Sequence, residues 1–356
     1  MLFVSNAIHK YRLKKARNWA ISMEKANLES LQKEMLTKLE KRSLKEVWGS
    51  LGLSINPLFY EMFKTLEGFN PYYLSDDLFF PFIIRTLNPS HYVDVQEHKG
   101  LYPVLYKDLP QPEILGLKFN GVLFNKFFEI VDDSYIFDKI EHEKSYIIKP
   151  STGSCMGRNV RKFDLRSMTL PQIKELISSY GENFIIQGVV KQSSKTRAFN
   201  ESSLNTFRVS TLNLNNHVSV CTINFKCGRN GAHVDNGGAG GLFFGVSKDG
   251  QFREYAYDNK YKKYYKLDSG LVVKDVKIDA VKELVNFAID AHKKYIPLCG
   301  FAGWDLALDE NDKPVFIEVN LGFPGIQLEQ LAAAQPIFGD RTCEVIDYVV
   351  KNQKMI

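Results

Sequence analysis

Two carboxylates and an amide converge on one face of a predicted hairpin in residues 303–325, which read GWDLALDENDKPVFIEVNLGFPG. A turn centred between the Asn and Asp of ENDKP places Asp305 directly opposite Glu318, and side-chain alternation puts Asn320 on the same face. Opposed carboxylates repel unless a cation lies between them, and oxygen ligands of this kind suit Mg²⁺. An exposed strand pair with incidental acids is the alternative, but here the acids interrupt apolar runs. The segment therefore favours a magnesium site.

A second segment, SYIIKPSTGSCMGRN at residues 145–159, joins an apolar strand to a loop of small residues. Lys149 ends the strand and precedes the glycines, whereas a Walker loop carries its lysine at the far end. Glycines let backbone N–H groups approach a phosphate and hydroxyls add donors, so the segment fits a phosphate loop, with an ordinary turn as the alternative. Its candidate ligands are Ser151, Thr152, Gly153, Ser154 and Gly157.

Two further segments carry polar residues in apolar or glycine-rich surroundings. SLNTFRVSTL places Asn205 and Arg208 near the start of a strand, and an arginine there suits a bidentate grip on phosphate or carboxylate. A surface salt bridge is the alternative for Arg208. The glycine-rich run FKCGRNGAHVDNGGAGGLFFGV offers Arg229, Asp235 and Asn236 as polar handles, either for close approach to a ligand or within a flexible lid.

The elements that position these residues are short strands mixed with helices from Leu109 onward. Two strands meet at Asn215-Asn216, a hairpin signal. Pro171 starts one predicted helix and Gly181 stops it, and a second helix follows the capping candidate Asp279. Frequent hairpins predict an α+β fold with antiparallel sheets rather than an alternating, doubly wound one.

The N-terminal part is predicted to be helical. Residues 8–47 contain no Pro or Gly, which predicts one long helix with an apolar stripe along Leu28, Leu31, Met35 and Leu39. An aromatic-rich stretch then predicts a buried helical subdomain. We expect four parts: a basic amphipathic helix (1–48), a helical subdomain (49–140), a smaller α+β subdomain (141–200) and a C-terminal α+β subdomain (201–356).

Positive charge is concentrated at the N-terminus, where residues 1–46 hold 11 Lys and Arg against 5 Glu. Either this helix packs on the body with a solvated basic face, or its cations dock on an acidic membrane or a partner. No nucleic-acid recognition motif follows. The cations concerned are Lys10, Arg12, Lys14, Lys15 and Arg17.

Several classes of protein are disfavoured. Five scattered cysteines without a C-x-x-C pair predict neither a disulfide framework nor a zinc site, and the seven histidines never pair at ligand spacing. No apolar stretch approaches the roughly 20 residues that a transmembrane helix needs, and the start lacks signal-peptide features. The sequence predicts a cytoplasmic protein, with peripheral contact at the inner face of the membrane if the basic helix binds lipid.

Read in order, KPSTGSCMG, FIIQGVV, LNTFRV, WDLAL and FIEVNLGFPG resemble the ATP-grasp superfamily over roughly residues 94–340. The segments LNTFRV, HVDNGGAGG and GWDLA are similar to its sugar-transfer-associated branch. The resemblance implies two α+β subdomains that grip ATP between antiparallel sheets after a helical N-terminal region. It implies ATP and Mg²⁺ as cofactors.

The resemblance also implies roles for individual residues. Lys149 and Lys99 would bind phosphates beneath the Gly153–Gly157 loop, and Arg208 and Arg229 would stabilise the transferring phosphoryl group. The D-K-N motif of the family reads His98-Lys99-Gly100 here, and the loop carries Cys155 and Met156. The magnesium ligands would be Asp305, Glu318 and Asn320, with Asn320 also in the catalytic set. The adenine hinge would be Gln187, Gly188, Val189 and Val190, and further nucleotide contacts would be Ser151, Ser154, Asn205, Asp235 and Asn236.

The implied activity is ATP- and Mg²⁺-dependent carboxylate-amine ligation through an acyl phosphate. By resemblance to the branch, the product would join an amino acid or similar group to a sugar acid in surface-polysaccharide or glycoconjugate biosynthesis. A peptide or natural-product amide ligase is one alternative. A non-catalytic ATP-binding module of a membrane-associated synthase is the other.

Overall fold

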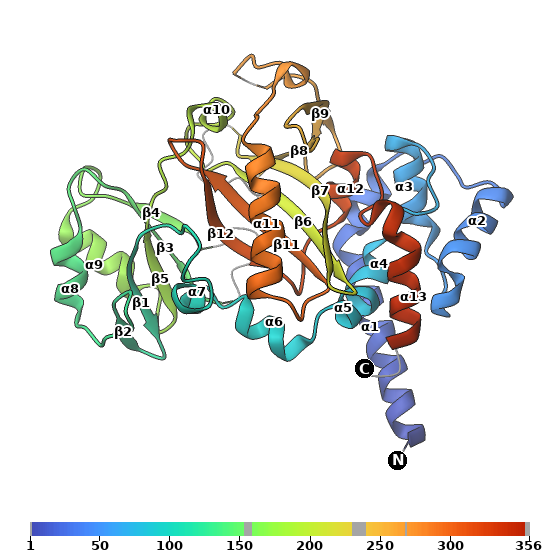
Figure 1. The fold of residues 1–356 in the computed structure, drawn as a ribbon, viewed down its shortest axis with the longest axis horizontal. Coiled ribbons are helices and arrows are strands. Elements are labelled where there is room, and N and C mark those ends of the chain that lie inside the picture. The colour runs from blue at the N-terminus through green and yellow to red at the C-terminus, as the bar shows by residue number, and fades with distance from the viewer. Residues whose placement is uncertain (1, 153–158, 230–239, 268, 353–356) are drawn as a thin grey trace.

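The structure, a computed structural model, describes residues 2–152, 159–229, 240–267 and 269–352, and only the backbone of residues 2–10. It contains two antiparallel sheets that lie side by side, with a helical region before the first strand (Figure 1). Each sheet has its own hydrophobic core. The predicted α+β fold with antiparallel sheets is therefore confirmed.

The smaller sheet has five strands in the order β2-β1-β5-β3-β4. Helices α8 and α9 pack on it around Tyr146, Ile148 and Phe184. The sheet takes strands from both sides of the predicted boundary at residue 140, and the four-part division of the chain remains a prediction. Its elements are β1 (Ile114–Phe119), β2 (Val122–Phe124), α8 (Asp133–Lys139), β3 (Tyr146–Pro150), β4 (Arg161–Phe163), α9 (Leu170–Ser178) and β5 (Phe184–Gly188).

The larger sheet has seven strands in the order β10-β9-β8-β7-β6-β11-β12. Helix α11 covers one face, where Phe207, Val209 and Trp304 are buried. The other face meets α12, α13 and the N-terminal helices. Its elements are α10 (Ser194–Arg197), β6 (Thr206–Leu214), β7 (His217–Cys227), β8 (Leu242–Val246), β9 (Phe252–Tyr257), β10 (Lys263–Tyr264), η5 (Val273–Asp275), α11 (Val281–Tyr295), β11 (Phe301–Leu308), β12 (Pro314–Asn320), α12 (Gln327–Ala333), η6 (Gly339–Arg341) and α13 (Thr342–Asn352).

Two hairpins form where the sequence predicts them. Leu214 pairs with His217 across Asn215-Asn216, whose φ angles of 54° and 59° are the left-handed values that this two-residue turn requires. Asp305 pairs with Glu318, as predicted. The turn between these strands is centred on Asn311, half a position earlier than predicted, and a register shift after Asp305 restores the predicted pair.

The two predicted helices of the α+β region are present, and one predicted cap is wrong. Helix α9 carries Pro171 in its first turn, and Gly181 after its end adopts a φ of 70°. The N-cap of α11 is Ala280, one residue later than predicted, and the helix begins at Val281. The carboxylate of Asp279 lies 3.6 Å from Lys277 Nζ instead.

The prediction of one helix over residues 8–47 is wrong. Helix α1 ends at Ser30, and Thr37 starts α2 with a reciprocal capping box that it forms with Glu40. The break between the two helices interrupts the predicted apolar stripe, and its last two members, Met35 and Leu39, are 69% and 77% exposed. Within the described ranges, none of the helices combines the length and the apolarity that crossing a bilayer requires. The elements are α1 (Leu2–Ser30), α2 (Lys38–Trp48), η1 (Gly49–Leu51), α3 (Pro57–Glu67), α4 (Asp76–Leu78), η2 (Phe79–Ile83), α5 (Ile84–Leu87), α6 (Ser90–Gln96), η3 (Lys99–Leu101) and α7 (Tyr102–Leu105).

Candidate functional site

The predicted oxygen donors meet on the face of the larger sheet opposite α11. Asp305 and Glu318 are cross-strand partners, and Asn320 donates from Nδ2 to Asp305 Oδ2 at 3.3 Å. Asp305 is buried, whereas Glu318 and Asn320 are half-buried. The structure therefore brings all three predicted metal ligands together and leaves two of them accessible to solvent.

Two cations neutralise Asp305 in the interior of this face. Arg208 grips it bidentately, with Nε to Oδ1 at 2.7 Å and Nη2 to Oδ2 at 3.0 Å, and Lys226 Nζ lies 2.9 Å from Oδ1. Burial alone would raise the pKa of Asp305, but Arg208 and Lys226 outweigh it and hold the pKa well below its usual value. Asp305 is therefore a permanent anion at neutral pH.

Arg208 is held from a second side by Glu329 on α12. Its Nη1 lies 3.1 Å from Glu329 Oε1, while Ser210 and Thr222 donate their hydroxyls to Oε2 at 2.6 and 3.2 Å. Gly303 gives the arginine room, because a Cβ there would lie 3.1 Å from Arg208 Cδ. Burial raises the pKa of Glu329, and Arg208 opposes that rise. Arg208 thus bridges two buried carboxylates.

Two lysines approach Glu318 from outside the larger sheet. Lys99 Nζ lies 3.2 Å from Glu318 Oε2. Lys149 lies near the end of β3. Burial and the charge of Lys99 lower its pKa, Glu318 raises it, and the net result is a pKa of about 8. The predicted phosphate lysines are therefore close enough to interact electrostatically, with Lys99 bound to Glu318 and the charge of Lys149 affected by both.

Unpartnered polar atoms lie beside these lysines. Within the described residues, His98 Nδ1 and Ser151 Oγ are buried without a hydrogen-bond partner. A Cβ at Gly100 would lie 3.0 Å from the His98 ring and 3.6 Å from Ser151 Cβ, so all three residues are packed together. Two orphaned polar groups next to two lysines fit the oxygens of a phosphate chain. The predicted loop residues Gly153, Ser154 and Gly157 lie outside the described residues, as do Asp235 and Asn236.

Glu97 fixes the backbone directly after β12, the strand that carries Glu318 and Asn320. Its carboxylate accepts the N–H groups of Leu321 and Gly322, the latter at 2.8 Å. Two residues on, the backbone N–H of Lys99 donates to Ser151 O at 3.0 Å, next to the predicted phosphate loop. The short segment from Glu97 to Lys99 therefore bonds to both sheets.

The predicted hinge forms the other connection between the sheets. Gln187 and Gly188 end β5, and Val189 donates its N–H to Ser145 O at 2.9 Å in the smaller half. After Val190 the chain enters the larger half, where Gln192 bridges to Asp309. The residues predicted to contact adenine therefore lie where the chain crosses between the sheets.

Asn205 lies apart from the lysines and the acids. It is fully buried, and its Nδ2 donates to Gln192 Oε1, Thr196 O and Asn200 O at 2.7 to 3.2 Å. These bonds shape the loop that follows the hinge. Direct contact of Asn205 with nucleotide stays a prediction, with loop support as its role in the structure.

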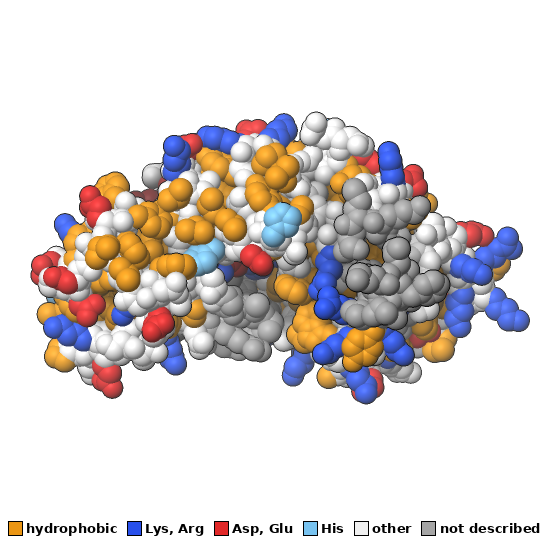
Figure 2. All heavy atoms as spheres, turned by 90° about the horizontal axis from the view of Figure 1, so that it is seen from below, with side chains coloured by type: hydrophobic (Ala, Val, Ile, Leu, Met, Phe, Trp, Pro, Cys, Tyr) orange, Lys and Arg blue, Asp and Glu red, His pale blue; other side chains and the backbone are white. Residues whose placement is uncertain are grey.

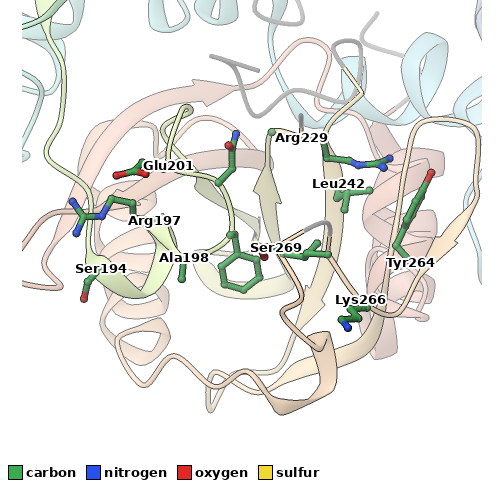
Figure 3. Close-up of a pocket in the computed structure, with 13 residues that line it drawn as sticks. Ser194, Arg197, Ala198, Glu201, Arg229, Leu242, Tyr264, Lys266 and Ser269 are labelled. Carbon is green, nitrogen blue, oxygen red and sulfur yellow. The ribbon is translucent and has the colours of Figure 1, made fainter. Parts of the chain in front are cut away.

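Arg229 also lies outside the acid and lysine cluster. Its guanidinium stacks on Tyr264 at 4.4 Å from the ring centre and lines a pocket of about 540 Å³ (Figure 3). The pocket opens beside α10, with Phe199 and Lys266 among its other walls. A role for Arg229 in phosphoryl transfer stays a prediction.

The donor set fits magnesium in chemical type. Mg²⁺ takes one or two carboxylates together with substrate phosphates, and Asp305, Glu318 and Asn320 supply oxygen ligands on one face. Within the described residues, no cluster of three or more His, Cys, Asp or Glu side chains is placed to hold a metal without such additional ligands. A metal here would therefore depend on the amide and on the phosphates of a bound nucleotide.

Three residues of this site were not singled out from the sequence: Lys226, Glu329 and Glu97. Lys226 follows the same alternation along β7 as Thr222 and Asn224, which contact Glu329, and the sequence alone shows this alternation. Glu329 and Glu97 sit in ordinary helical contexts, and only their tertiary contacts reveal them.

A family model described as sugar-transfer associated ATP-grasp matches residues 84–344. A search of curated proteins gave no match. Similar solved structures include an L-amino acid ligase from Bacillus licheniformis, with 13% identity and a TM-score of 0.44 over 72% of this chain and 48% of that one.

Two further solved structures are similar at the same low level. The D-alanine-D-alanine ligase from Coxiella burnetii has 14% identity and a TM-score of 0.42, over 73% of this chain and 60% of that one. D-alanyl-alanine synthetase A from Vibrio cholerae has 18% identity and a TM-score of 0.45, over 76% and 68%. This chain spans about half to two thirds of the length of these structures, and the low TM-scores carry no statement about its activity.

Proposed function

Because the chain belongs to the sugar-transfer-associated ATP-grasp family, we propose that it is an ATP- and Mg²⁺-dependent ligase that joins a carboxylate to an amine through an acyl phosphate. The observation that carries the proposal is the ion pair of Lys99 with Glu318, which is the cross-strand partner of Asp305, together with Lys149, whose charge interacts with both Glu318 and Lys99. Cations and oxygen donors around one position suit phosphoryl transfer, which relies on positioning and charge neutralisation.

In this proposal each residue has a limited task. Lys99 and Lys149 bind phosphate oxygens, with Ser151 Oγ and His98 Nδ1 as additional polar contacts. Asp305, Glu318 and Asn320 would hold magnesium, which neutralises charge on the phosphates when bound. Arg208, fixed by two carboxylates, presents its remaining N–H groups to the transferring group. The hinge from Gln187 to Val190 supplies backbone groups to adenine.

The substrates that we propose are an amino acid or similar amine and a sugar acid used in surface-polysaccharide or glycoconjugate assembly. This step rests on the name of the matched family. Purified protein with ATP, Mg²⁺ and a panel of acids and amines should release ADP only with the right pair. Hydroxylamine in place of the amine should give a hydroxamate, because it traps an acyl phosphate.

Two alternatives predict different outcomes of that assay. A peptide or natural-product amide ligase would release ADP with a product of different mass. A non-catalytic ATP-binding module would bind nucleotide without releasing ADP with any pair, and Asp305→Asn with Glu318→Gln would leave its cellular role intact. Absence of ADP and hydroxamate across a broad panel counts against the ligase.

We also propose that the N-terminal part of α1 makes peripheral contact with an anionic membrane on the cytoplasmic side. The N-terminal end of α1 projects beyond the body, and Figure 2 shows Lys and Arg side chains gathered on the half of the visible face that carries α1 and α2. Arg12, Lys14 and Lys15 are exposed, whereas Arg17 is bound to Asp77 at 2.6 Å and is not available. Each basic residue near such a surface contributes about 1 kcal/mol of attraction.

Sedimentation with lipid vesicles tests this contact. The chain should bind phosphatidylserine vesicles at low salt, and replacing the three exposed cations by Gln should abolish the binding. Equal binding to neutral vesicles would contradict the proposal.

A further inference from the structure

We infer that Glu329 is a positioning residue that keeps Arg208 paired when Asp305 exchanges the arginine for a divalent cation. Glu329 lies on α12, outside the strands that carry the predicted ligands. The inference rests on the proposed function, because it assumes that Asp305 binds magnesium. It concerns the cationic side chains of Arg208 and Lys226, which already bind Asp305.

The first step is that Asp305 has no vacant position in the structure. Its Oδ1 accepts from Arg208 Nε at 2.7 Å and lies 2.9 Å from Lys226 Nζ, while Oδ2 accepts from Arg208 Nη2 at 3.0 Å and from Asn320 Nδ2 at 3.3 Å. Asp305 is 2% exposed. A metal ion can therefore reach this carboxylate only if the existing cations loosen their contacts.

The second step is the consequence for Arg208. Its side chain is 10% exposed, so a guanidinium that lost Asp305 would be a buried cation without a partner. Removing one partner of a buried ion pair is strongly unfavourable, and this cost would oppose metal binding directly. A second carboxylate next to Arg208 removes most of that cost.

The third step is that Glu329 is built to be this second partner. It is fully buried and contacts Arg208 Nη1 at 3.1 Å through Oε1, on a nitrogen that Asp305 does not use. Ser210 and Thr222 donate to its other oxygen, so the carboxylate stays in place whether or not Asp305 holds the arginine. The four charged groups Arg208, Lys226, Asp305 and Glu329 also balance one another, which leaves the metal to be matched by nucleotide phosphates.

The experiment measures the affinity for ADP by calorimetry at a series of Mg²⁺ concentrations, in the wild type and in Glu329→Gln. We expect ADP affinity in EDTA to be unchanged, and the Mg²⁺ concentration that half-saturates the tightening of ADP binding to rise roughly 10- to 100-fold. The control Glu61→Gln alters another buried carboxyl, 2% exposed and on α3, and should leave the Mg²⁺ response unchanged. A response in Glu329→Gln equal to that of the wild type overturns the inference.

Two further results keep the outcomes separate. Glu329→Asp retains the charge but withdraws it from Arg208, so a folded Asp variant should shift the Mg²⁺ response in the same direction by a smaller factor. If it responds like the wild type, the inference fails even where the Gln variant does not fold. If the wild type itself binds ADP equally well with and without Mg²⁺, the proposed function fails and the inference fails with it.

Discussion

Lys149 holds its charge in surroundings that oppose it. Burial and the neighbouring Lys99 lower its pKa to about 8, although Glu318 acts in the other direction. A phosphate chain placed beside the two lysines would supply the missing negative charge. The residue is therefore poised to gain a stable proton when a nucleotide binds.

The first prediction concerns pH. Above pH 8 the free protein loses the proton of Lys149, so nucleotide affinity should fall by up to about tenfold per pH unit, with proton uptake on binding. Calorimetry of ADP binding in buffers of different ionisation enthalpy measures both quantities. Lys149→Arg stays charged and should show a flat profile.

The lowered pKa of Lys149 affects folding stability in the opposite direction from nucleotide affinity. Between pH 8 and the ordinary lysine pKa, the unfolded chain binds more protons than the folded protein. The contribution of Lys149 to the free energy of unfolding therefore becomes more favourable as the pH rises through that window.

The second prediction concerns Asp305. Asp305→Asn leaves Arg208 and Lys226 without their shared anion, and breaking a buried pair in this way should lower the free energy of unfolding by about 3 kcal/mol. Urea denaturation at pH 7 measures the change. The exposed Asp138→Asn on α8 should change stability by less than about 0.5 kcal/mol. Equal stability of the wild type and Asp305→Asn would mean that the ion pairs are not the stabilising interactions that we infer.

At the scale of elements, the segment from α6 to η3 fastens the site together. Glu97 anchors the backbone that follows β12, and the backbone of Lys99 anchors the end of β3. Both contacts involve the segment that connects the helical region to the first sheet. The helical region therefore contributes directly to the geometry of the predicted metal and phosphate positions.

The third prediction tests this fastening by hydrogen exchange. Glu97→Gln weakens the acceptor of the Leu321 and Gly322 amides, and exchange in that loop should accelerate by the equivalent of about 1 to 2 kcal/mol. The amides of Leu321 and Gly322 hold the pKa of Glu97 below the value that burial alone would give, so protonation of Glu97 at low pH should weaken these bonds and loosen the same loop in the wild type. Glu143→Gln, at a side chain 85% exposed, is the control and should leave the loop unchanged. Unchanged exchange in Glu97→Gln would contradict the anchoring role.

On the scale of the whole molecule, two sheets with separate cores meet at the candidate site. Within the described residues the lysine of β3 and the acids of β11 and β12 come from different sheets, so a bound nucleotide would contact both halves. The chain passes from the smaller to the larger sheet after Gly188. A second connection is made by the segment at Lys99, whose backbone N–H donates to Ser151 O. Nucleotide binding should therefore stabilise the arrangement of the two halves.

The fourth prediction concerns ligand and metal removal. ADP with Mg²⁺ at about 100 times its Kd should stabilise the folded state by about 2.7 kcal/mol. Differential scanning calorimetry measures this as a rise in Tm, and EDTA should remove most of the rise. The combined Asp305→Asn and Glu318→Gln variant should lose the Mg²⁺-dependent part of the rise. A variant that retains it would show that the metal binds elsewhere.

Local patterns were sufficient for the features that depend on neighbouring residues. Alternation and a short turn place Asp305 opposite Glu318. The predicted turn centre was half a position too late, but the register shift after Asp305 compensates, so the predicted pair still forms. Helix continuity was not decided locally, because good helix formers run through residues 31–37 while the Thr37 capping box starts a new helix. Propensity summed along a chain does not register a cap that competes with it.

The sequence by itself determined the antiparallel α+β fold, the family, and which carboxylates face each other, since these follow from side-chain alternation, turn chemistry and ordered motifs. Only the tertiary structure decided that Arg208 is shared by Asp305 and Glu329, that Glu97 anchors the loop after β12, and that Asn205 and Arg229 lie apart from the acids. The physical reason is that these contacts join residues more than a hundred positions apart or on different elements. The energies of these contacts depend on how deeply the charged groups are buried and on the distances between them, and both are known only once the chain has folded.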